Sequence, residues 1–254
     1  MRLPLLIAPL LLGFAHPGIG TAAGVAQDST ETYRVVLMRA APGRLLELIE
    51  SLGERSAVLE AAGEARPLIM RHSQGDQWDL LVLQPVGTLR SYFSAESDAR
   101  RETAASAAGS SEVAWESRLR ESLSWREELF ADGPARDILA EYDAGTELYH
   151  VEMFLALPGK YEELVEQRLM ENRYYALTAR RGNLVFTRVA GAAWDVFTIG
   201  FYRDLQHFAE DAPVTEEEAE AAAVEAGFEA RNRIGTYLRT LMASHQDTLA
   251  GAVR

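Results

Sequence analysis

The protein has 254 residues, of which 48% are hydrophobic, and a formal net charge of −13. Such an acidic chain repels phosphate backbones and anionic lipid surfaces, so we expect no nucleic-acid partner. The chain has no cysteine, which excludes disulfides, thiolate metal ligands and a cysteine nucleophile. The fold must therefore be stabilised by packing.

The N-terminus has the pattern of an export signal. Arg2 supplies a positive start, and the apolar run from Pro4 to Phe14 is too short to span a bilayer. Small residues follow, and either Gly24-Val25-Ala26 or Thr21-Ala22-Ala23 offers a cleavage site. We expect a periplasmic or secreted mature protein with no membrane segment after cleavage. An uncleaved anchor is the alternative.

One stretch of the sequence occurs twice. Residues 75–83 read GDQWDLLVL and residues 191–199 read GAAWDVFTI. Subtracting 78 from 194, the positions of the two tryptophans, gives a spacing of 116. The same spacing relates Tyr33 to Tyr149 and one Pro-Gly pair to another, without a gap. This agreement indicates an internal duplication.

The two copies predict the same order of elements. Apolar β-branched runs bounded by turn residues indicate strands, and apolar residues at helical spacing indicate helices. In the first copy these are strand 33–40, helix 44–62, hairpin strands 67–71 and 78–84, and a helix from residue 89. In the second copy they are strand 149–157, helix 160–178, hairpin strands 183–189 and 194–200, and a helix from residue 204.

Each copy continues into a region that we interpret as long extra helices. Trp115, Leu119, Leu123 and Phe130 mark the first region. The second carries an apolar stripe formed by Phe228, Ile234, Leu238, Leu241 and Met242. No fourth strand is evident in either copy, although one near Ile138-Leu139 is an alternative. The small and charged segment 94–111 is expected to be flexible.

The repeated unit resembles the dimeric α/β-barrel superfamily. The residues that carry the resemblance are Trp78-Asp79-Leu80-Leu81-Val82 with Leu89 and Tyr92, and Trp194-Asp195-Val196-Phe197 with Leu205 and Phe208. The resemblance implies an α+β fold in which two tandem ferredoxin-like units form an intrachain pseudo-dimer α/β barrel, here with extra long helices. That superfamily includes cofactor-free monooxygenases, isomerases, cyclases, haem proteins and stress-response proteins, so the resemblance leaves the function open.

These features divide the chain into five segments. We expect a signal peptide at 1–26, a disordered N-terminus at 27–32 and the first ferredoxin-like repeat plus helix at 33–135. A linker at 136–148 precedes the second repeat and C-terminal helix at 149–254.

His150 and Glu152 are the candidate catalytic residues. They share one face of the strand that opens the second copy, because alternate residues of a strand point the same way. His150 would act as a general base oriented by Glu152. A metal site with His72 as a third ligand is an alternative, and a solvated strand face is another. No repeated ligand cluster accompanies the pair, so no metal is predicted.

Five further residues are candidate ligand-binding residues. Tyr174 and Tyr175 put phenols where the first copy has aliphatic side chains, which suggests that the second half holds something polar. Arg71, His72 and Arg188 lie near the ends of the hairpin strands and would bind an anionic group. The alternatives are tyrosines that pack with their hydroxyls in water and arginines that are ordinary surface charges.

The Trp-Asp pairs and the C-terminal histidine are interpreted as structural. Trp78-Asp79 and Trp194-Asp195 recur in both copies, as packing residues should. His245 and Asp247 are two residues apart and do not face each other on a helix. His245 is therefore expected to interact with the carbonyl groups at a helix end.

The sequence favours an exported protein that binds a small molecule in a barrel pocket, whether as a binding protein or as a cofactor-independent enzyme. No cofactor is predicted. The main alternative is a non-catalytic structural or stress-related envelope protein that forms a homo-oligomer through its helices, with a barrel interior filled by apolar side chains. A haem-binding protein is a further alternative.

Overall fold

The computed structural model describes residues 30–254, so the expected export signal lies outside the described residues. The first repeat comprises β1 (Thr30–Ala40), α1 (Leu45–Ala61), β2 (Leu68–Gln74), β3 (Leu80–Gly87), α2 (Leu89–Tyr92), α3 (Ala95–Ala107), α4 (Glu112–Glu121) and β4 (Leu123–Pro134). Helix α5 (Arg136–Asp143) connects the repeats. The second repeat comprises β5 (Leu148–Ala156), α6 (Tyr161–Leu177), β6 (Leu184–Gly191), β7 (Val196–Tyr202), α7 (Leu205–Phe208), α8 (Glu216–Glu225), the short 3₁₀ helix η1 (Arg231–Arg233), α9 (Ile234–Arg239) and β8 (Met242–Val253).

The strands close into one barrel. The first repeat contributes four adjacent strands in the order β4-β1-β3-β2, and the second contributes β8-β5-β7-β6, which is the same order. Antiparallel pairing of β2 with β8 and of β4 with β6 joins the two sheets. Every described strand thus has a neighbour on both sides, so none is left as an open edge. The predicted α+β fold of two tandem ferredoxin-like units is confirmed.

The prediction that the repeats lack a fourth strand was wrong. β4 and β8 are strands of 12 residues each, and each pairs along nearly the whole first strand of its own repeat. The error has a physical source. Apolar residues at 115, 119, 123 and 130 fall four and seven apart, which imitates helical spacing across the junction of α4 and β4.

Other boundaries also differ from expectation. Strand β1 begins at Thr30, so the last three residues of the segment expected to be disordered are paired with β4. Segment 94–111 contains α3, whose N-cap Ser94 accepts a hydrogen bond from the backbone of Ser97. The linker at 136–148 contains α5, so Ile138 and Leu139 are helical and form no strand.

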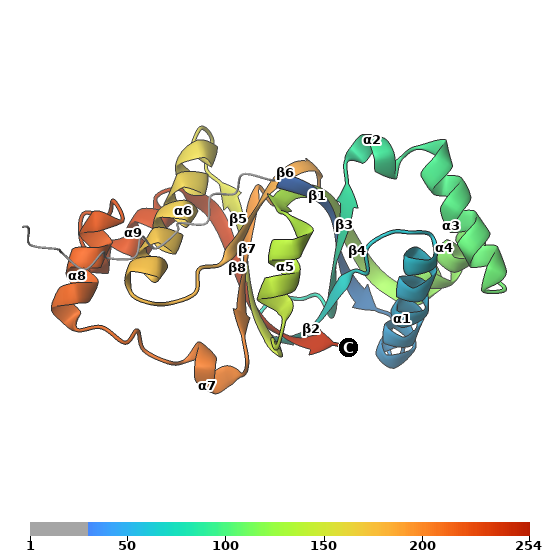
Figure 1. Ribbon diagram of the computed structural model, residues 1–254, viewed down its shortest axis with the longest axis horizontal. Helices are drawn as coiled ribbons and strands as arrows, with labels where there is room; N and C mark the ends of the chain where they lie inside the picture. The colour runs from blue at the N-terminus through green and yellow to red at the C-terminus, as the bar shows by residue number, and fades with distance from the viewer. Residues whose placement is uncertain (1–29) are drawn as a thin grey trace, which may run out of the picture.

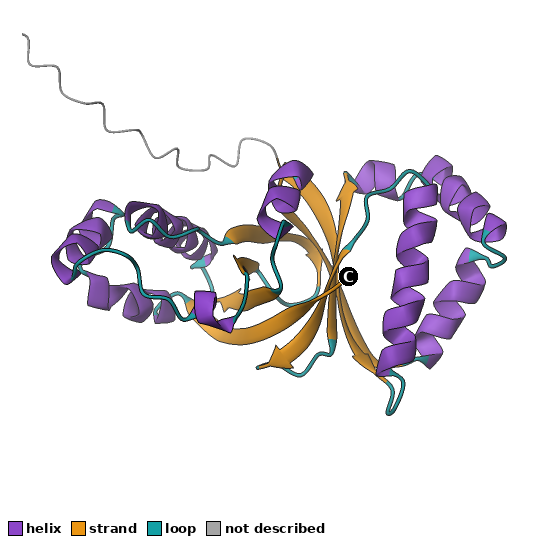
Figure 2. Ribbon diagram, turned by 60° about the horizontal axis from the view of Figure 1, so that its bottom comes forward, coloured by secondary structure: helices purple, strands orange, loops and turns teal. Residues whose placement is uncertain are grey.

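The core has an inner part and two outer parts. Alternate residues of all eight strands fill the barrel interior with apolar side chains, including Tyr33, Val35, Met70, Tyr149 and Phe186. The outer face of each sheet is covered by the helices of its own repeat, which lie at opposite ends of the long axis of the molecule (Figures 1 and 2). Helix α5 lies across the barrel between them (Figure 1).

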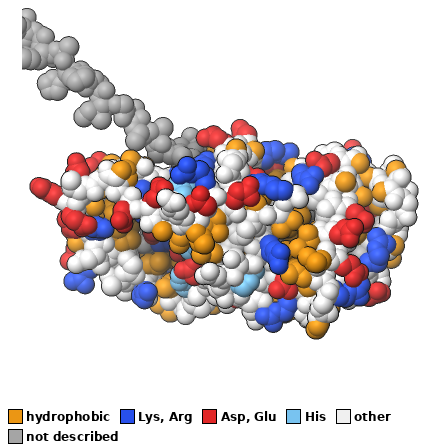
Figure 3. Space-filling model, turned by 90° about the horizontal axis from the view of Figure 1, so that it is seen from below, with side chains coloured by type: hydrophobic (Ala, Val, Ile, Leu, Met, Phe, Trp, Pro, Cys, Tyr) orange, Lys and Arg blue, Asp and Glu red, His pale blue; other side chains and the backbone are white. Residues whose placement is uncertain are grey.

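The surface agrees with the acidic composition. On the face shown in Figure 3, acidic and basic side chains are interspersed, and acidic groups gather at the end formed by the second-repeat helices. Three consecutive glutamates, Glu216 to Glu218, lie there in the first turn of α8, where they complement the helix dipole. Within residues 30–254, no helix is both long and apolar enough to cross a membrane.

Candidate functional site

The two candidate catalytic residues lie on the outer face of the barrel. Tyr149, Val151 and Met153 of β5 point into the apolar interior, so the intervening His150 and Glu152 point outward. The expectation that these two residues line a pocket inside the barrel was therefore wrong, because the alternation along β5 places them against α6.

His150 and Glu152 form a polar cluster with two residues of the neighbouring strand β8. A ring nitrogen of His150, Nε2, is hydrogen-bonded to Oδ1 of Asp247. Nε2 of His245 lies 3.5 Å from Oε1 of Glu152, and the His245 ring stacks on Phe154 with 4.7 Å between ring centroids. We call His150, Glu152, His245 and Asp247 the second-repeat cluster.

Helix α6 supplies a buried cation to this cluster. Nη1 of Arg168 lies 3.3 Å from Oε2 of Glu152, and only 2% of the Arg168 side chain is exposed. The same guanidinium contacts Glu171 one turn further along α6. Thr198 of β7 donates a hydrogen bond of 3.0 Å to Oε2 of Glu152. The Glu152 carboxylate is thus held between the sheet and the helix by at least two donors.

The environment shifts the pKa values of both candidate residues. Burial alone would raise the pKa of Glu152, but His245, Arg168, His150 and Thr198 outweigh it and lower that pKa to about 2. Burial alone would lower the pKa of His150, but the hydrogen bond to Asp247 and the charge of Glu152 raise it above its ordinary value of 6.5. Glu152 is therefore an anion at neutral pH.

The first repeat holds different chemistry at the same positions. Where the second repeat has His150 and Asp247, the first has Arg34 and Glu128, joined by hydrogen bonds of 2.6 and 3.1 Å. Arg126, which takes the place of His245, donates a further bond of 2.6 Å to Glu128.

Three apolar residues of the first repeat also become polar in the second. Val36, Leu52 and Val82 form part of the apolar core beneath α1. At the spacing of 116 their counterparts are Glu152, Arg168 and Thr198. Burying polar groups is costly unless they are paired, so this exchange makes the second repeat the more polar of the two beneath its helices.

The structure separates the five candidate ligand-binding residues. Tyr175 lies near the cluster, and its hydroxyl donates a hydrogen bond of 2.7 Å to Glu171. Tyr174 packs instead against α8. Arg188 pairs with Asp195 at 2.5 Å, and Arg71 is exposed on β2. His72 packs edge-on against Trp78 with 5.8 Å between ring centroids.

The repeated Trp-Asp pairs make matching contacts. Oδ2 of Asp79 accepts a hydrogen bond of 2.8 Å from the backbone N–H of Ala40, and Oδ2 of Asp195 accepts one of 2.9 Å from Ala156. Each aspartate thereby fixes the end of the first strand in its repeat. Trp78 is fully buried in the barrel core. Trp194 is only partly buried against the same core, so the contacts support a structural role for the two aspartates and Trp78.

Sequence reasoning missed the roles of His245 and Asp247. The segment around them was interpreted as the end of a helix, where residues two apart diverge. It is strand β8, and residues two apart on a strand share a face. The missed signal was the pairing of β8 with β5, which sets Asp247 opposite Glu152 and His245 opposite Phe154.

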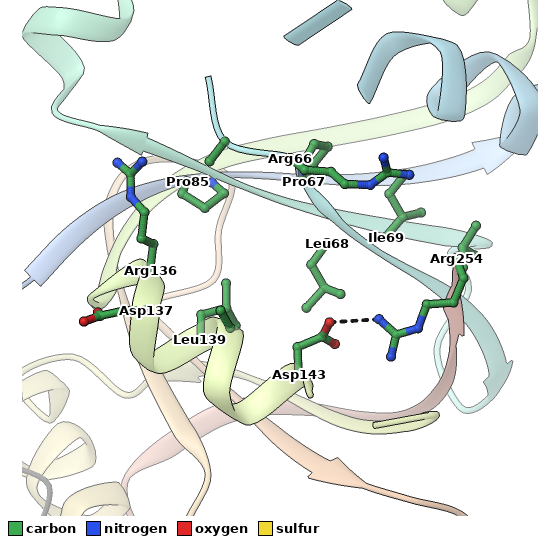
Figure 4. Close-up of a pocket in the computed structure, with 13 residues that line it drawn as sticks. Arg66, Pro67, Leu68, Ile69, Pro85, Arg136, Asp137, Leu139, Asp143 and Arg254 are labelled. Atoms are coloured by element: carbon green, nitrogen blue, oxygen red, sulfur yellow. Dashed lines mark hydrogen bonds and ion pairs between the residues drawn. The ribbon is translucent and has the colours of Figure 1, made fainter. Parts of the chain in front are cut away.

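A separate pocket of about 410 Å³ opens at one end of the barrel, beside α5. Its apolar walls are formed by Pro67, Leu68, Ile69, Pro85, Leu139 and Val253. Leu68 of β2 and Leu139 of α5 lie on facing sides of the space (Figure 4). Arg66, Arg136 and Arg254 also line this site, which we call the α5 pocket.

Each arginine of the α5 pocket has an acidic partner. Arg136 donates to both carboxylate oxygens of Glu31, at 2.6 and 3.0 Å. Nη1 of Arg254 donates to Asp143 at 2.8 Å, as Figure 4 shows, and Nη1 of Arg66 donates to Glu60 at 3.2 Å. A guanidinium has five N–H groups, so these pairs leave donors for a ligand.

The Tyr149 hydroxyl links the barrel core to the wall of the α5 pocket. The Tyr149 side chain lies in the barrel, and its hydroxyl donates a hydrogen bond of 2.5 Å to Asp143 at the pocket wall. Burial and this bond raise the pKa of Tyr149 well above its ordinary range. Tyr149 therefore stays protonated and holds Asp143 in place.

The strand order and the closed eight-stranded barrel give the chain the fold of a tandem dimeric α/β barrel. A solved structure of an anthrone oxidase-like protein is similar, with a TM-score of 0.55, 12% identity, and coverage of 91% of this chain and 94% of that one. A candidate monooxygenase from Fusobacterium nucleatum subsp. nucleatum matches with a TM-score of 0.52, 10% identity, and coverage of 89% and 94%. At such identities the likeness shows the fold alone. No protein-family model and no curated protein matches the sequence.

Proposed function

We propose that the protein binds a small, mostly apolar molecule carrying a carboxylate or a similar anionic group in the α5 pocket. The observation that carries the proposal is the pocket itself, because about 410 Å³ lies within the range of small-molecule sites. Its apolar walls suit a hydrocarbon or aromatic body, and the unused N–H groups of its arginines suit an anionic end.

The arginines make the α5 pocket more favourable for an anion than the rest of this acidic surface. The chain carries a net charge of −13, which repels anions from most of its surface. The pocket lining holds three arginines against two aspartates, Asp137 and Asp143. Since these arginines are also paired with Glu31, Asp143 and Glu60, an anion would be held by their unused N–H groups, above an apolar floor.

The test uses the fluorescent probe 1-anilinonaphthalene-8-sulfonate, which has an aromatic body and one anionic group. Ala140 is an exposed α5 residue that lines the pocket, so Ala140→Trp is expected to fill the space and abolish probe binding. Arg66→Ala is expected to weaken binding several-fold. Arg203→Ala, an exposed arginine of the second repeat, is the matched control. Equal probe binding by Ala140→Trp and the unaltered protein would refute the proposal.

We further propose that the protein acts after export, in the periplasm or outside the cell. The support is the pattern of residues 1–26, with its positive start, short apolar run and small residues. Expression of the full chain followed by N-terminal sequencing of the mature protein tests this. The expected mature N-terminus follows Ala23 or Ala26, and an intact Met1 on the folded protein would contradict export with cleavage.

Catalysis at the second-repeat cluster is the second candidate function. The observation that favours it is the hydrogen bond between His150 and Asp247, since a carboxylate that orients an imidazole is a common acid–base arrangement. The sequence alone suggested that Glu152 orients His150, but the residue hydrogen-bonded to the His150 ring is Asp247. Because one similar structure is of an anthrone oxidase-like protein, the test is conversion of anthrone and O₂ to anthraquinone and water. Catalysis by the unaltered protein and its loss in His150→Ala are expected.

The structural alternative retains part of its support. The apolar barrel interior is what a non-catalytic envelope protein requires. Self-association through Leu238 and Leu241 is not supported, because both are buried beneath α6, so charging them would unfold the second repeat. For the haem alternative, an absorption spectrum of the protein mixed with haem is the test, and the absence of a shifted Soret band would exclude it.

A further inference from the structure

The second-repeat cluster brings together donor atoms of the kinds that bind transition metals. One ligand atom each from His150, Glu152 and Asp247 lies within 4.8 Å of the other two. A metal bonded at about 2.1 Å to each of three ligands sets those ligands about 3 to 3.5 Å apart. Small side-chain rotations therefore convert the present arrangement into a coordination triad.

The scaffold of the triad is rigid. His150 and Glu152 are two residues apart on β5, and Asp247 is the residue of β8 paired with Glu152. β5 and β8 are hydrogen-bonded neighbours, so the three side chains leave one stretch of sheet in a fixed relation. Sites on strands hold their geometry better than sites on loops.

His245 provides a second, independent observation. Its Nε2 atom is buried and makes no hydrogen bond, although it lies 3.5 Å from Glu152. The stacking on Phe154 fixes the plane of the ring. The long contact with Glu152 leaves this nitrogen only weakly paired, and a metal held by Glu152 would give it a ligand role.

The formal charges of the cluster suit a divalent cation. Glu152, Glu171 and Asp247 supply three negative charges, and Arg168 supplies one positive charge. With both imidazoles neutral, the remainder is −2. In the first repeat the two histidine positions hold Arg34 and Arg126, whose fixed cations occupy the space that a metal would need.

We propose that His150, Glu152 and Asp247, with His245 as a fourth ligand, bind one divalent transition metal ion on the outer face of the second repeat. Two imidazoles with two carboxylates favour Mn²⁺, Fe²⁺, Co²⁺ or Zn²⁺ over Mg²⁺ and Ca²⁺, which prefer oxygen ligands alone. Asp247 has 55% of its side chain exposed, so the metal enters from its side. Arg168 and Thr198 hold Glu152 in position from beneath α6.

This site is independent of the α5 pocket and competes with the acid–base role of His150. A metal on Nε2 of His150 replaces the hydrogen bond to Asp247 and leaves the ring proton on Nδ1, so the imidazole no longer acts as a base. Failure of probe binding in the α5 pocket would leave the metal site untouched. Failure of metal binding would likewise leave the pocket untouched.

The test is a titration of tag-free protein with CoCl₂, followed by visible absorption and by calorimetry. We expect one Co²⁺ per chain. His150→Arg recreates the pair seen in the first repeat, and Asp247→Ala alters an exposed side chain, so both variants are expected to keep their circular dichroism spectra. Each is expected to weaken Co²⁺ binding at least tenfold, since even residues that only support a ligand cost about 10- to 100-fold.

His207→Ala is the matched control. Nδ1 of His207 accepts a hydrogen bond from the backbone of Arg203, and the residue is outside the triad, so its loss should leave the titration unchanged. The inference is overturned if the unaltered protein shows no visible band at millimolar Co²⁺. It is equally overturned if His150→Arg and Asp247→Ala, with native spectra, bind Co²⁺ less than about tenfold more weakly than the unaltered protein.

Discussion

His150 occupies in the second repeat the position that Arg34 holds in the first, and each residue reaches the neighbouring strand to pair with a carboxylate. The partners, Asp247 and Glu128, occupy equivalent positions. In the register of the strands, Asp247 lies opposite the residue two positions after His150, and Glu128 lies opposite the residue two positions after Arg34. The same position thus holds a permanently charged cation in one repeat and an imidazole in the other.

The two carboxylates are expected to differ in their contribution to stability. Only 16% of the Arg34 side chain is exposed. Glu128→Ala removes the carboxylate that pairs with it, and the guanidinium cannot become neutral by losing its proton. We expect a loss of about 2 to 3 kcal/mol in the free energy of unfolding. Asp247→Ala leaves an imidazole that can become neutral, so we expect less than about 1 kcal/mol. Urea unfolding of both variants measures this, and equal losses would contradict the comparison.

Acid should destabilise the protein partly through Glu128. Burial would raise the pKa of this carboxyl, but Arg34 and Arg126 outweigh it and hold the pKa below its ordinary value of 4.5. Because the folded-state pKa is the lower one, the stabilisation is complete above pH 4.5 and is lost as the pH falls through the folded-state pKa. Glu128→Gln should therefore flatten the fall of the unfolding free energy between about pH 5 and pH 3. Glu217→Gln, on the exposed start of α8, should not flatten it.

The fold was predictable because its signals lie within each repeat. The spacing between Trp78 and Trp194 revealed the duplication, and the strand–helix–strand–strand pattern indicated ferredoxin-like units. The fourth strands were not predictable in the same way. β4 carries Trp125, Arg126 and Glu128, whose side chains are held by partners on other elements, so its own sequence lacks a clean alternation of apolar and polar residues.

Half of the candidate site was predictable, because two of its four residues are close together in the sequence. His150 and Glu152 are two apart on one strand, so sequence alone places them together. Asp247 and His245 join them only through the pairing of β5 with β8, a contact across almost 100 residues. A comparison of both repeats would have singled out Arg168, because the first repeat has an apolar leucine at that position of the same helix.

The repeated aspartates are expected to matter for stability and to be silent for ligand binding. Asp79→Ala and Asp195→Ala each leave a backbone N–H at the end of the first strand without its acceptor, which costs about 1 to 2 kcal/mol. Asp79→Asn retains a carbonyl oxygen and should lose less. Chemical unfolding measures these losses, and probe binding in the α5 pocket is the second readout. A weakened probe affinity in Asp79→Ala at full folding would contradict the structural role.

The repeated glycines show how the two repeats meet. A Cβ added to Gly75 would lie 2.1 Å from the carbonyl oxygen of Asp247, and one added to Gly191 would lie 2.5 Å from that of Glu128. Each glycine therefore sits against the fourth strand of the other repeat. Both also have positive φ angles, of 116° and 102°, which side chains rarely adopt. The glycine of the duplicated motif thus lies where the sheets of the two repeats pair with each other.

Substitution of Gly75 should weaken the contact between the two sheets. In Gly75→Ala the new methyl group meets backbone atoms of β8 that cannot rotate away, and the strain of the positive φ adds to the clash, so we expect a loss of at least about 3 kcal/mol in the free energy of unfolding. Gly159→Ala is the matched control, because Gly159 has a φ of 77° with nothing within 4 Å of its added Cβ. It carries the conformational cost alone, about 1 kcal/mol. If urea unfolding gives the two variants the same loss, the β2–β3 hairpin does not rest against β8 as described.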